Sequence, residues 1–179
     1  MALDNDKLLA TGDLFLPGLV QQVFHKYKRT NGTILTTAER TELFIELSAL
    51  LGEDLLERAL RLLDEWSFII YYTADRLRSI AELSSKRNLA HVVRVVPGVN
   101  YCKCRYFQRC VLQLTDKEEG EEEEEEEQQE IDINKSNQVS FTCEHVLAQR
   151  LHWLVNLEPR AQILTLDQFR YFHNDFYED

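Results

Sequence analysis

The sequence predicts an α+β domain in which N-terminal helices precede a small antiparallel sheet, a cysteine-containing segment and a further helix. Apolar residues recur at helical spacing through the first third of the chain, and aromatic or β-branched residues dominate from Ser67 to Thr73 and again in the valine run from Val92 to Val96. All four cysteines lie between residues 102 and 143. A chain of 179 residues can bury one core, yet it is small enough to gain from a cross-link. We therefore expect one domain with three parts, residues 1–66, 67–157 and 158–179.

Three helices are expected in the first part. The first covers Leu14 to Tyr27 and has Pro17 in its first turn, where a missing backbone N–H costs nothing. The second begins at the sequence Thr36-Thr37-Ala38-Glu39, which has the form of a capping box, and ends at Gly52. The third continues to about Glu65, so the three helices follow one another with short connections.

The chain from Ser67 to Val96 has the composition of an antiparallel sheet. Phe68 to Tyr72 are aromatic or β-branched, and Ala74-Asp75 can turn the chain into an alternating partner strand. Pro97-Gly98 marks a later turn. The expected strands are residues 67–73, 77–81 and 89–96, a short strand carrying Cys102 and Cys104, and residues 139–142.

Two short cysteine motifs carry the clearest chemical signal. Cys102 and Cys104 are separated by one residue, and so are Cys143 and His145. Three thiolates and one imidazole complete the tetrahedral ligand set that structural zinc prefers, and they leave no position open for a substrate. Because side chains two apart lie on the same side of an extended strand, the first pair can converge on one ion. The pattern therefore predicts a structural site for one zinc ion.

A helix is expected from Cys143 to Leu157, which would place one ligand pair at a helix start. The positive end of the helix dipole stabilises a thiolate at Cys143, and His145 lies in the same turn. Ala148 shares the face of His145, and its small side chain lets the helix pack closely. A last helix is expected after the capping sequence Thr165-Leu166-Asp167-Gln168, with Phe169, Phe172 and Phe176 on its apolar face.

Other interpretations of these residues remain open at this point. Cys110 lies in an apolar segment and is expected to be a small core residue, although it could serve as an exchangeable fifth ligand. Cys143 and His145 could form a nucleophile pair, but they lack an orienting third group. The four predicted ligands could also be unrelated buried residues. The remaining histidines lack partners at ligand spacing: His25, His91, His152 and His173.

The net charge of −11 is concentrated in one segment. Between Asp116 and Asn137, ten glutamates and two aspartates stand against two lysines, which gives a local charge of −10. A run of like charge repels itself and cannot bury apolar surface, so we expect a disordered insert. It is interpreted as a solvated tether, with an acidic lure for a basic partner or a nucleic-acid mimic as alternatives. No basic leader or long apolar run is present, so a soluble intracellular protein without membrane contact is expected.

The two motifs resemble the SWIM-type zinc finger, in which Cys-x-Cys is followed by a spacer and by Cys-x-His-x-x-Ala. Here the motif is Cys102-Lys103-Cys104, then Cys143-Glu144-His145 and Ala148. The spacer, Arg105 to Thr142, is longer than usual at 38 residues, and removing the 22 acidic-insert positions leaves an ordinary 16. The order of helices, strand and finger from about Leu43 to Leu157 is similar to that of small SWIM proteins of the Shu-complex type.

This resemblance implies a non-enzymatic, nuclear subunit without a small-molecule substrate. Such a subunit pairs with a RecA-like recombinase paralogue and helps recombinase filaments assemble on single-stranded DNA in homologous recombination. A direct DNA-binding finger is the alternative, because Lys103, Arg105 and Arg109 adjoin the first ligand pair. A SWIM interaction module of another pathway is a third possibility. The apolar helices at both ends either pack into the core or leave a surface for a partner.

Overall fold

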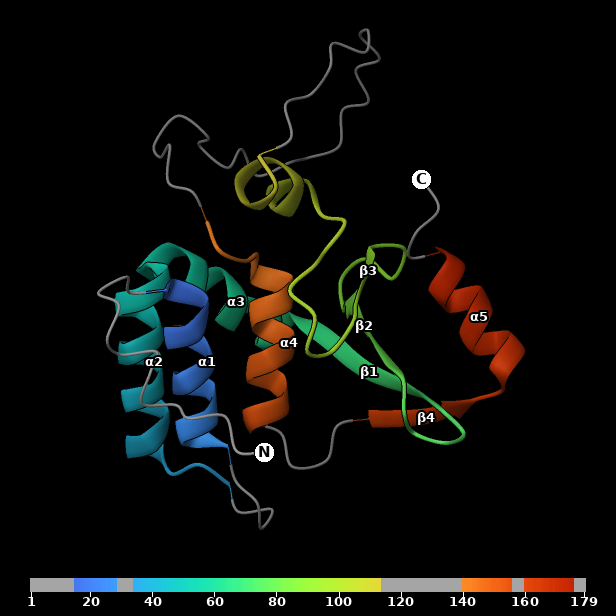
Figure 1. The fold of residues 1–179 in the computed structure, drawn as a ribbon, viewed down its shortest axis with the longest axis horizontal. Coiled ribbons are helices and arrows are strands. Elements are labelled where there is room, and N and C mark those ends of the chain that lie inside the picture. Colours follow the sequence, from blue (N-terminus) through green and yellow to red (C-terminus); the bar gives the residue numbers. More distant parts are fainter. Residues whose placement is uncertain (1–14, 29–33, 114–139, 156–159, 176–179) are drawn as a thin grey trace, which may run out of the picture.

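The structure is a computed structural model and describes residues 15–28, 34–113, 140–155 and 160–175. Helices and a four-stranded sheet form an α+β fold, as predicted. In Figure 1 the sheet lies between a group of helices that precede residue 156 and one helix from the C-terminal end of the chain. None of the helices in the described part of the chain has the length and apolar character needed to cross a bilayer.

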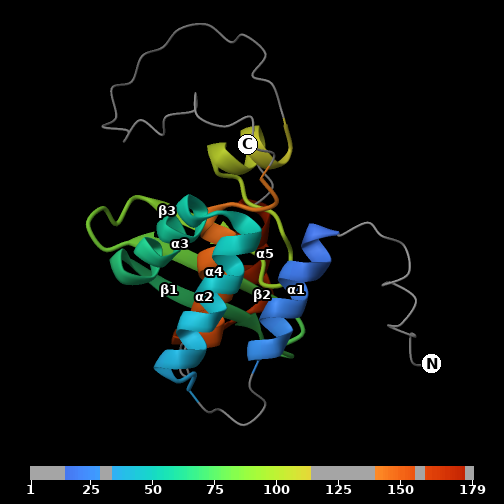
Figure 2. The same cartoon turned by 90° about the vertical axis from the view of Figure 1, so that its left-hand side faces the viewer.

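The three predicted N-terminal helices are present. They are α1 (Leu16–Tyr27), α2 (Thr37–Leu51) and α3 (Glu53–Glu65). The capping box of α2 forms as expected: the Thr36 hydroxyl accepts from the Glu39 backbone N–H, and the Glu39 carboxylate accepts from the Thr36 backbone N–H. Gly52, with φ of 87°, separates α2 from α3, a backbone conformation that glycine adopts without strain. Figure 2 shows α1 and α2 side by side in front of the sheet.

The sheet has the strand order β3-β2-β1-β4 and is mixed, not antiparallel throughout. The strands are β1 (Trp66–Thr73), β2 (Ser79–Ser85), β3 (Val92–Val95) and β4 (Arg160–Leu164). The pairs β1–β2 and β2–β3 are antiparallel, as predicted, but β4 runs parallel to β1. The sequence analysis did not predict β4. Its residues form a strand because they pair with the open edge of β1, which is far from them in the sequence.

Helix α4 (Glu144–Val155) packs against α3 and touches β2 and β3, while α5 (Leu166–Asp175) contacts β1 and β4. The sheet therefore has helices α1–α4 on one side and α5 on the other (Figure 1). Side chains of β1 alternate between the two faces. Phe68 and Ile70 belong to the main core with the helices, and Tyr71 belongs to a smaller cluster with Leu164 and Phe169.

The apolar stripes of the terminal helices pack into these cores. In α1 the buried side chains are Val20, Val23, Phe24 and Tyr27, and in α5 Phe169 is buried. Self-packing, one of the two interpretations of these stripes, is thus confirmed for the residues described. Phe176 lies outside the described residues.

Two predicted strands are wrong. Residues 101–103 belong to no regular element, and Cys104 lies in a bend that leads into a helical turn, so Cys102 and Cys104 do not lie on a strand. Residues 140–142 form a bend, and Val139 lies outside the described part of the chain. In place of a regular finger sheet, the chain between the ligand pairs forms a short π-helix, η2 (Phe107–Val111). The acidic insert, residues 116–137, also lies outside the described residues.

Candidate metal centre

The four predicted ligands come together in one buried cluster. The ligand atoms of Cys102, Cys104, Cys143 and His145 all lie within 4.8 Å of one another. In a tetrahedral zinc site with Zn–S bonds of about 2.3 Å, neighbouring sulfur atoms are about 3.8 Å apart. The cluster is therefore compact enough for all four atoms to bind one ion. Cys102, Cys143 and His145 are buried, and Cys104 is partly exposed.

The first ligand pair is held by its own backbone, not by a sheet. The Cys104 backbone N–H donates to the Cys102 Sγ at 3.4 Å, and the Phe107 backbone N–H donates to the Cys104 Sγ at 3.4 Å. The turn after Cys104 begins the helical segment that becomes η2. Backbone N–H groups that point at sulfur favour the charged thiolate, which is the form that binds a metal. This turn thus brings the Cys102 and Cys104 side chains together, which the predicted strand was expected to do.

The second pair sits at the start of α4, as predicted. Cys143 immediately precedes the helix, and its carbonyl accepts from the Leu147 backbone N–H at 3.0 Å. Its side chain is therefore at the positive end of the helix dipole, where a thiolate is stabilised. Ala148 lies one turn after His145 and is completely buried in the main core. The helix that carries two ligands is thus anchored by the same core that holds the sheet.

A hydrogen bond links the two segments of the chain that carry the ligands, at positions just before the first ligand of each pair. The side-chain amide of Asn100 donates to the Phe141 carbonyl at 2.8 Å, and each of these residues precedes a ligand cysteine by two positions. A second link lies further along the spacer, where the Ser140 backbone N–H donates to the Cys110 carbonyl at 3.2 Å. These bonds help to hold the two ligand pairs near each other.

The thiols and the imidazole of the cluster shift one another's pKa values. Hydrogen bonds with Cys102 and Cys143 hold the pKa of the Cys104 thiol well below its usual range, whereas hydrogen bonds with Cys102 and Cys104 raise the pKa of Cys143. Burial disfavours protonated His145, but hydrogen bonds with Cys102 and Cys104 outweigh it and raise the pKa of His145 to about 10. Three adjacent thiolates are unfavourable without a cation, so the protons stay in the cluster until a cation replaces them.

A carboxylate and a guanidinium lie behind the histidine. The Nδ1 atom of His145 is 3.6 Å from a Glu144 carboxylate oxygen, and the other Glu144 oxygen is 3.9 Å from the Arg58 Nε. The His145 Nδ1, the Arg58 Nε and the Glu144 oxygen that faces Arg58 are buried and make no hydrogen bond within the described residues. A metal-bound histidine commonly donates its second ring N–H to a carboxylate. Glu144 is placed to accept that hydrogen bond when the other ring nitrogen binds an ion.

Aromatic rings enclose the same side of the cluster. Trp66 meets the His145 ring edge-on at 5.6 Å between centroids, and Arg58 lies over the Tyr106 ring at 4.9 Å. The sequence analysis missed Glu144 and Arg58 as supporting residues. Glu144 could have been found from its place between the two ligands, but Arg58 belongs to α3 and has no local signal in the sequence.

The donor set fits a structural metal ion better than a catalytic one. All four positions of a tetrahedron are filled by protein atoms, so no ligand position remains for water or substrate. Thiolate and imidazole ligands together are compatible with zinc. Among the described residues, no other group of histidine, cysteine and carboxylate side chains is close enough to hold an ion.

The residues that were considered as alternatives lie elsewhere. Cys110 is half-buried in η2, and burial raises the pKa of its thiol; it is not part of the ligand cluster. The rings of two of the remaining histidines pack on aromatic side chains of β1: His91 on Trp66 and His152 on Phe68. His173 lies near Phe169 in α5, and His25 is exposed on α1.

Comparison with models of known protein families, with curated proteins and with solved structures gives no match in any of the three.

Proposed function

We propose that Cys102, Cys104, Cys143 and His145 hold one structural zinc ion and that the chain is a non-enzymatic adaptor. The observation that carries this proposal is the closed donor set, in which four protein ligands fill the tetrahedron. Such a site stabilises a fold and presents no position where a substrate could meet the ion. A protein built around it acts through its surfaces.

The adaptor is proposed to be a SWIM-type subunit of a Shu-type complex in the nucleus. Support comes from the spacing of the ligands, Cys-x-Cys followed by Cys-x-His-x-x-Ala, together with the burial of Ala148 behind the cluster. The partner would be a RecA-like recombinase paralogue, and the complex would promote recombinase filament assembly on single-stranded DNA during homologous-recombination repair.

Co-expression with a panel of RecA-like recombinase paralogues tests this function. We expect one of them to raise the yield of soluble protein and to co-purify at a fixed ratio, and we expect the pair to bind single-stranded DNA more tightly than this chain alone. The matched control is the same panel with Cys143→Ser, which should lose the complex together with zinc. A chain that stays monomeric with every paralogue contradicts the assignment.

Direct DNA binding by the finger is the second candidate. Arg105 is exposed beside Cys104 and offers a contact to a phosphate, although Lys103 and Arg109 are only partly exposed and already engaged in other interactions. A DNA-binding protein that neutralises several phosphates shows a steep dependence of affinity on salt. Tight, salt-sensitive binding of DNA by the isolated chain, lost in Arg105→Gln, would favour this candidate over the adaptor.

A further inference from the structure

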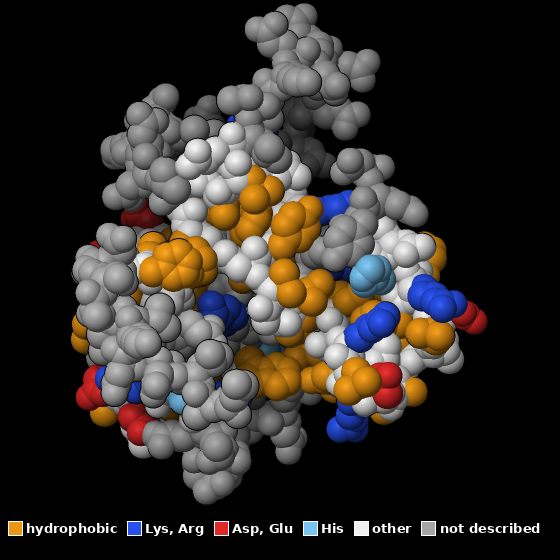
Figure 3. Space-filling view, in the orientation of Figure 1, with side chains coloured by type: hydrophobic (Ala, Val, Ile, Leu, Met, Phe, Trp, Pro, Cys, Tyr) orange, Lys and Arg blue, Asp and Glu red, His pale blue; other side chains and the backbone are white. Residues whose placement is uncertain are grey.

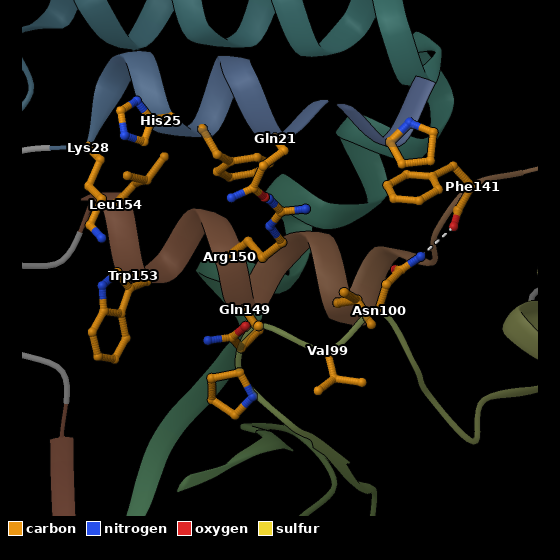
Figure 4. Close-up of a pocket in the computed structure, with 15 residues that line it drawn as sticks. Gln21, His25, Lys28, Val99, Asn100, Phe141, Gln149, Arg150, Trp153 and Leu154 are labelled. Carbon is orange, nitrogen blue, oxygen red and sulfur yellow. Dashed lines mark hydrogen bonds between the residues drawn. The ribbon is translucent and has the colours of Figure 1, made fainter. Parts of the chain in front are cut away.

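A groove of about 480 Å³ lies along α4, the helix whose start carries two of the metal ligands. Figure 4 shows α4 as its floor, α1 as one wall and the loop containing Val99 and Asn100 as the other. One end holds Lys28, Leu154 and Trp153, and the other holds Phe141 and Asn100 (Figure 4). The groove is distinct from the ligand cluster, but the same segments shape both.

The charge of the groove is opposite to the charge of the chain. Although the protein carries 31 acidic residues, none of those in the described part of the chain lines this groove, while Lys28, Arg150 and His25 do. Figure 3 shows the same face of the molecule: apolar side chains gather over its middle with Lys or Arg side chains beside them, and acidic ones lie toward the margins. An anionic group would be attracted to this position.

Arg150 is the central group of the groove. Its guanidinium donates to the Gln21 side-chain oxygen at 2.7 Å and lies 3.9 Å above the Phe24 ring. Both partners are neutral, and among the described residues no carboxylate pairs with it. Burial lowers the pKa of Arg150, so its positive charge is held at a cost that an incoming anion would offset. Gln21 and Phe24 hold the Arg150 guanidinium in place, and its remaining N–H groups can donate to a carboxylate.

Next to this charge the groove is apolar. Trp153 lies one turn after Arg150 on α4 and leaves 47% of its surface exposed, although its ring is among the largest apolar groups of the chain. Pro17, Pro97 and Val99 extend the apolar lining. The Asn100 amide already donates to the Phe141 carbonyl, and its side-chain oxygen can accept a hydrogen bond from a peptide backbone. The site thus combines one fixed cation, an aromatic shelf and a side-chain amide.

We propose that this groove docks an extended segment of a partner protein that carries an Asp or Glu two positions from an aromatic or aliphatic residue. The carboxylate binds Arg150 as a bidentate pair, and the apolar side chain covers Trp153. Side chains two positions apart lie on the same side of an extended segment, about 6.6 Å from each other, a spacing of the same order as the rise of about 4.5 Å between Arg150 and Trp153 on α4.

A peptide fits the groove better than single-stranded nucleic acid does. Nucleic acid carries a charge at every nucleotide and needs a stripe of cations, whereas this groove has one fixed cation and a lysine at its end. The segment of charge −10 also rejoins the described chain at Ser140, next to Phe141 of the groove. Its field repels a polyanion far more than a peptide with one carboxylate. The proposal does not rest on the identity of the recombinase paralogue.

Selection from a library of random peptides displayed on phage, with the full zinc-loaded chain as bait, tests the proposal. We expect enrichment of sequences with an acidic residue two positions from an aromatic or aliphatic one. A synthetic peptide from the enriched set should bind Arg150→Gln at least ~10-fold more weakly than wild type. Arg76→Gln, a change of an exposed arginine in the β1–β2 turn, is the matched control and should bind normally. Changing the acidic residue of the peptide to its amide should weaken its binding to the wild type by the same factor. The same change in the peptide should weaken its binding to Arg150→Gln only slightly.

Folding failures are separated from binding failures by zinc content and by the thermal midpoint of each variant. Lys28→Gln gives a second variant, since Lys28 is exposed at the end of α1, and it should weaken binding by a smaller factor. Peptides without acidic residues, or equal affinity for Arg150→Gln and wild type, overturn the proposal. So does oligothymidine binding that Arg150→Gln abolishes, because it assigns the groove to nucleic acid. Peptide binding that appears only after deletion of residues 116–137 would show that the chain's own acidic segment is the occupant.

Discussion

Cys143 and Cys110 differ in their expected role in metal binding, although both lie in segments that adjoin the same core. Cys143 belongs to the ligand cluster, and Cys110 is half-buried outside it. Zinc binding contributes about 10–16 kcal/mol in zinc-finger peptides, as much as the whole stability of a typical domain, about 5–15 kcal/mol. Cys143→Ser should therefore lose zinc and unfold or become insoluble, whereas Cys110→Ser should keep one zinc per chain. Elemental analysis and circular dichroism check both. A folded, zinc-free and functional Cys143→Ser protein would count against the site.

Glu144 is a supporting residue whose effect should appear in metal affinity. Its carboxylate lies 3.6 Å from the His145 Nδ1, and loss of such a partner costs a metal site about 10–100-fold in affinity. Glu144→Ala should bind zinc at least ~10-fold more weakly in competition with a chelator. Glu144→Gln keeps an acceptor oxygen and should recover part of the loss. Glu42→Ala, an exposed change on α2, is the control. Equal affinity of Glu144→Ala and wild type would show that the carboxylate does not hold the histidine.

At the scale of elements, the sequence predicted those that depend on neighbours along the chain. The capping box of α2 is local, and so is that of α5, where Thr165 and Gln168 exchange hydrogen bonds. Strand β4 depends instead on the free edge of β1, and four of its five residues are exposed, so it lacks the apolar alternation of a half-buried strand. Cys102 and Cys104 were placed on a strand because their spacing suits one, yet N–H···S bonds in a turn achieve the same convergence.

Helix α4 joins the ligand cluster to the core, so its packing should be sensitive to side-chain volume. Ala148 is completely buried, and α4 packs against α3. Ala148→Leu inserts three carbon atoms into filled space and should reduce the free energy of unfolding by about 1–3 kcal/mol, with weaker zinc binding as the ligand helix shifts. Ala49→Leu on α2 makes the same change at an exposed position and should alter stability by less than about 0.5 kcal/mol. Denaturant titration measures both. Equal stability of the two variants would show that α4 does not need a small residue there.

For the whole molecule, the sequence identified the ligands and the fold class but not how the parts share a core. One buried cluster draws on α1 to α4, on the sheet and on the ligand residues Cys102 and Cys143. The metal centre is therefore part of the main core and not a separate finger. Residues such as Arg58 of α3 reach the site only through this packing, which no motif in the sequence encodes. The division into residues 1–66, 67–157 and 158–179 stays a prediction.

The acidic segment gives the test of how far the molecule depends on its long spacer. The Ser140 backbone N–H bonds to the Cys110 carbonyl at 3.2 Å, so the chain leaves and re-enters the described structure at one place. Deleting residues 116–137 shortens the 38-residue spacer to 16, and the cost of closing a loop changes by less than about 1 kcal/mol over that range. We expect the deletion protein to keep one zinc per chain and nearly the same denaturation midpoint. Replacing the ten glutamates of the segment by glutamine keeps its length and isolates the effect of charge. Zinc loss in the deletion but not in the glutamine variant would show that the segment's length is needed by the site; zinc loss in both would show that its charge is needed.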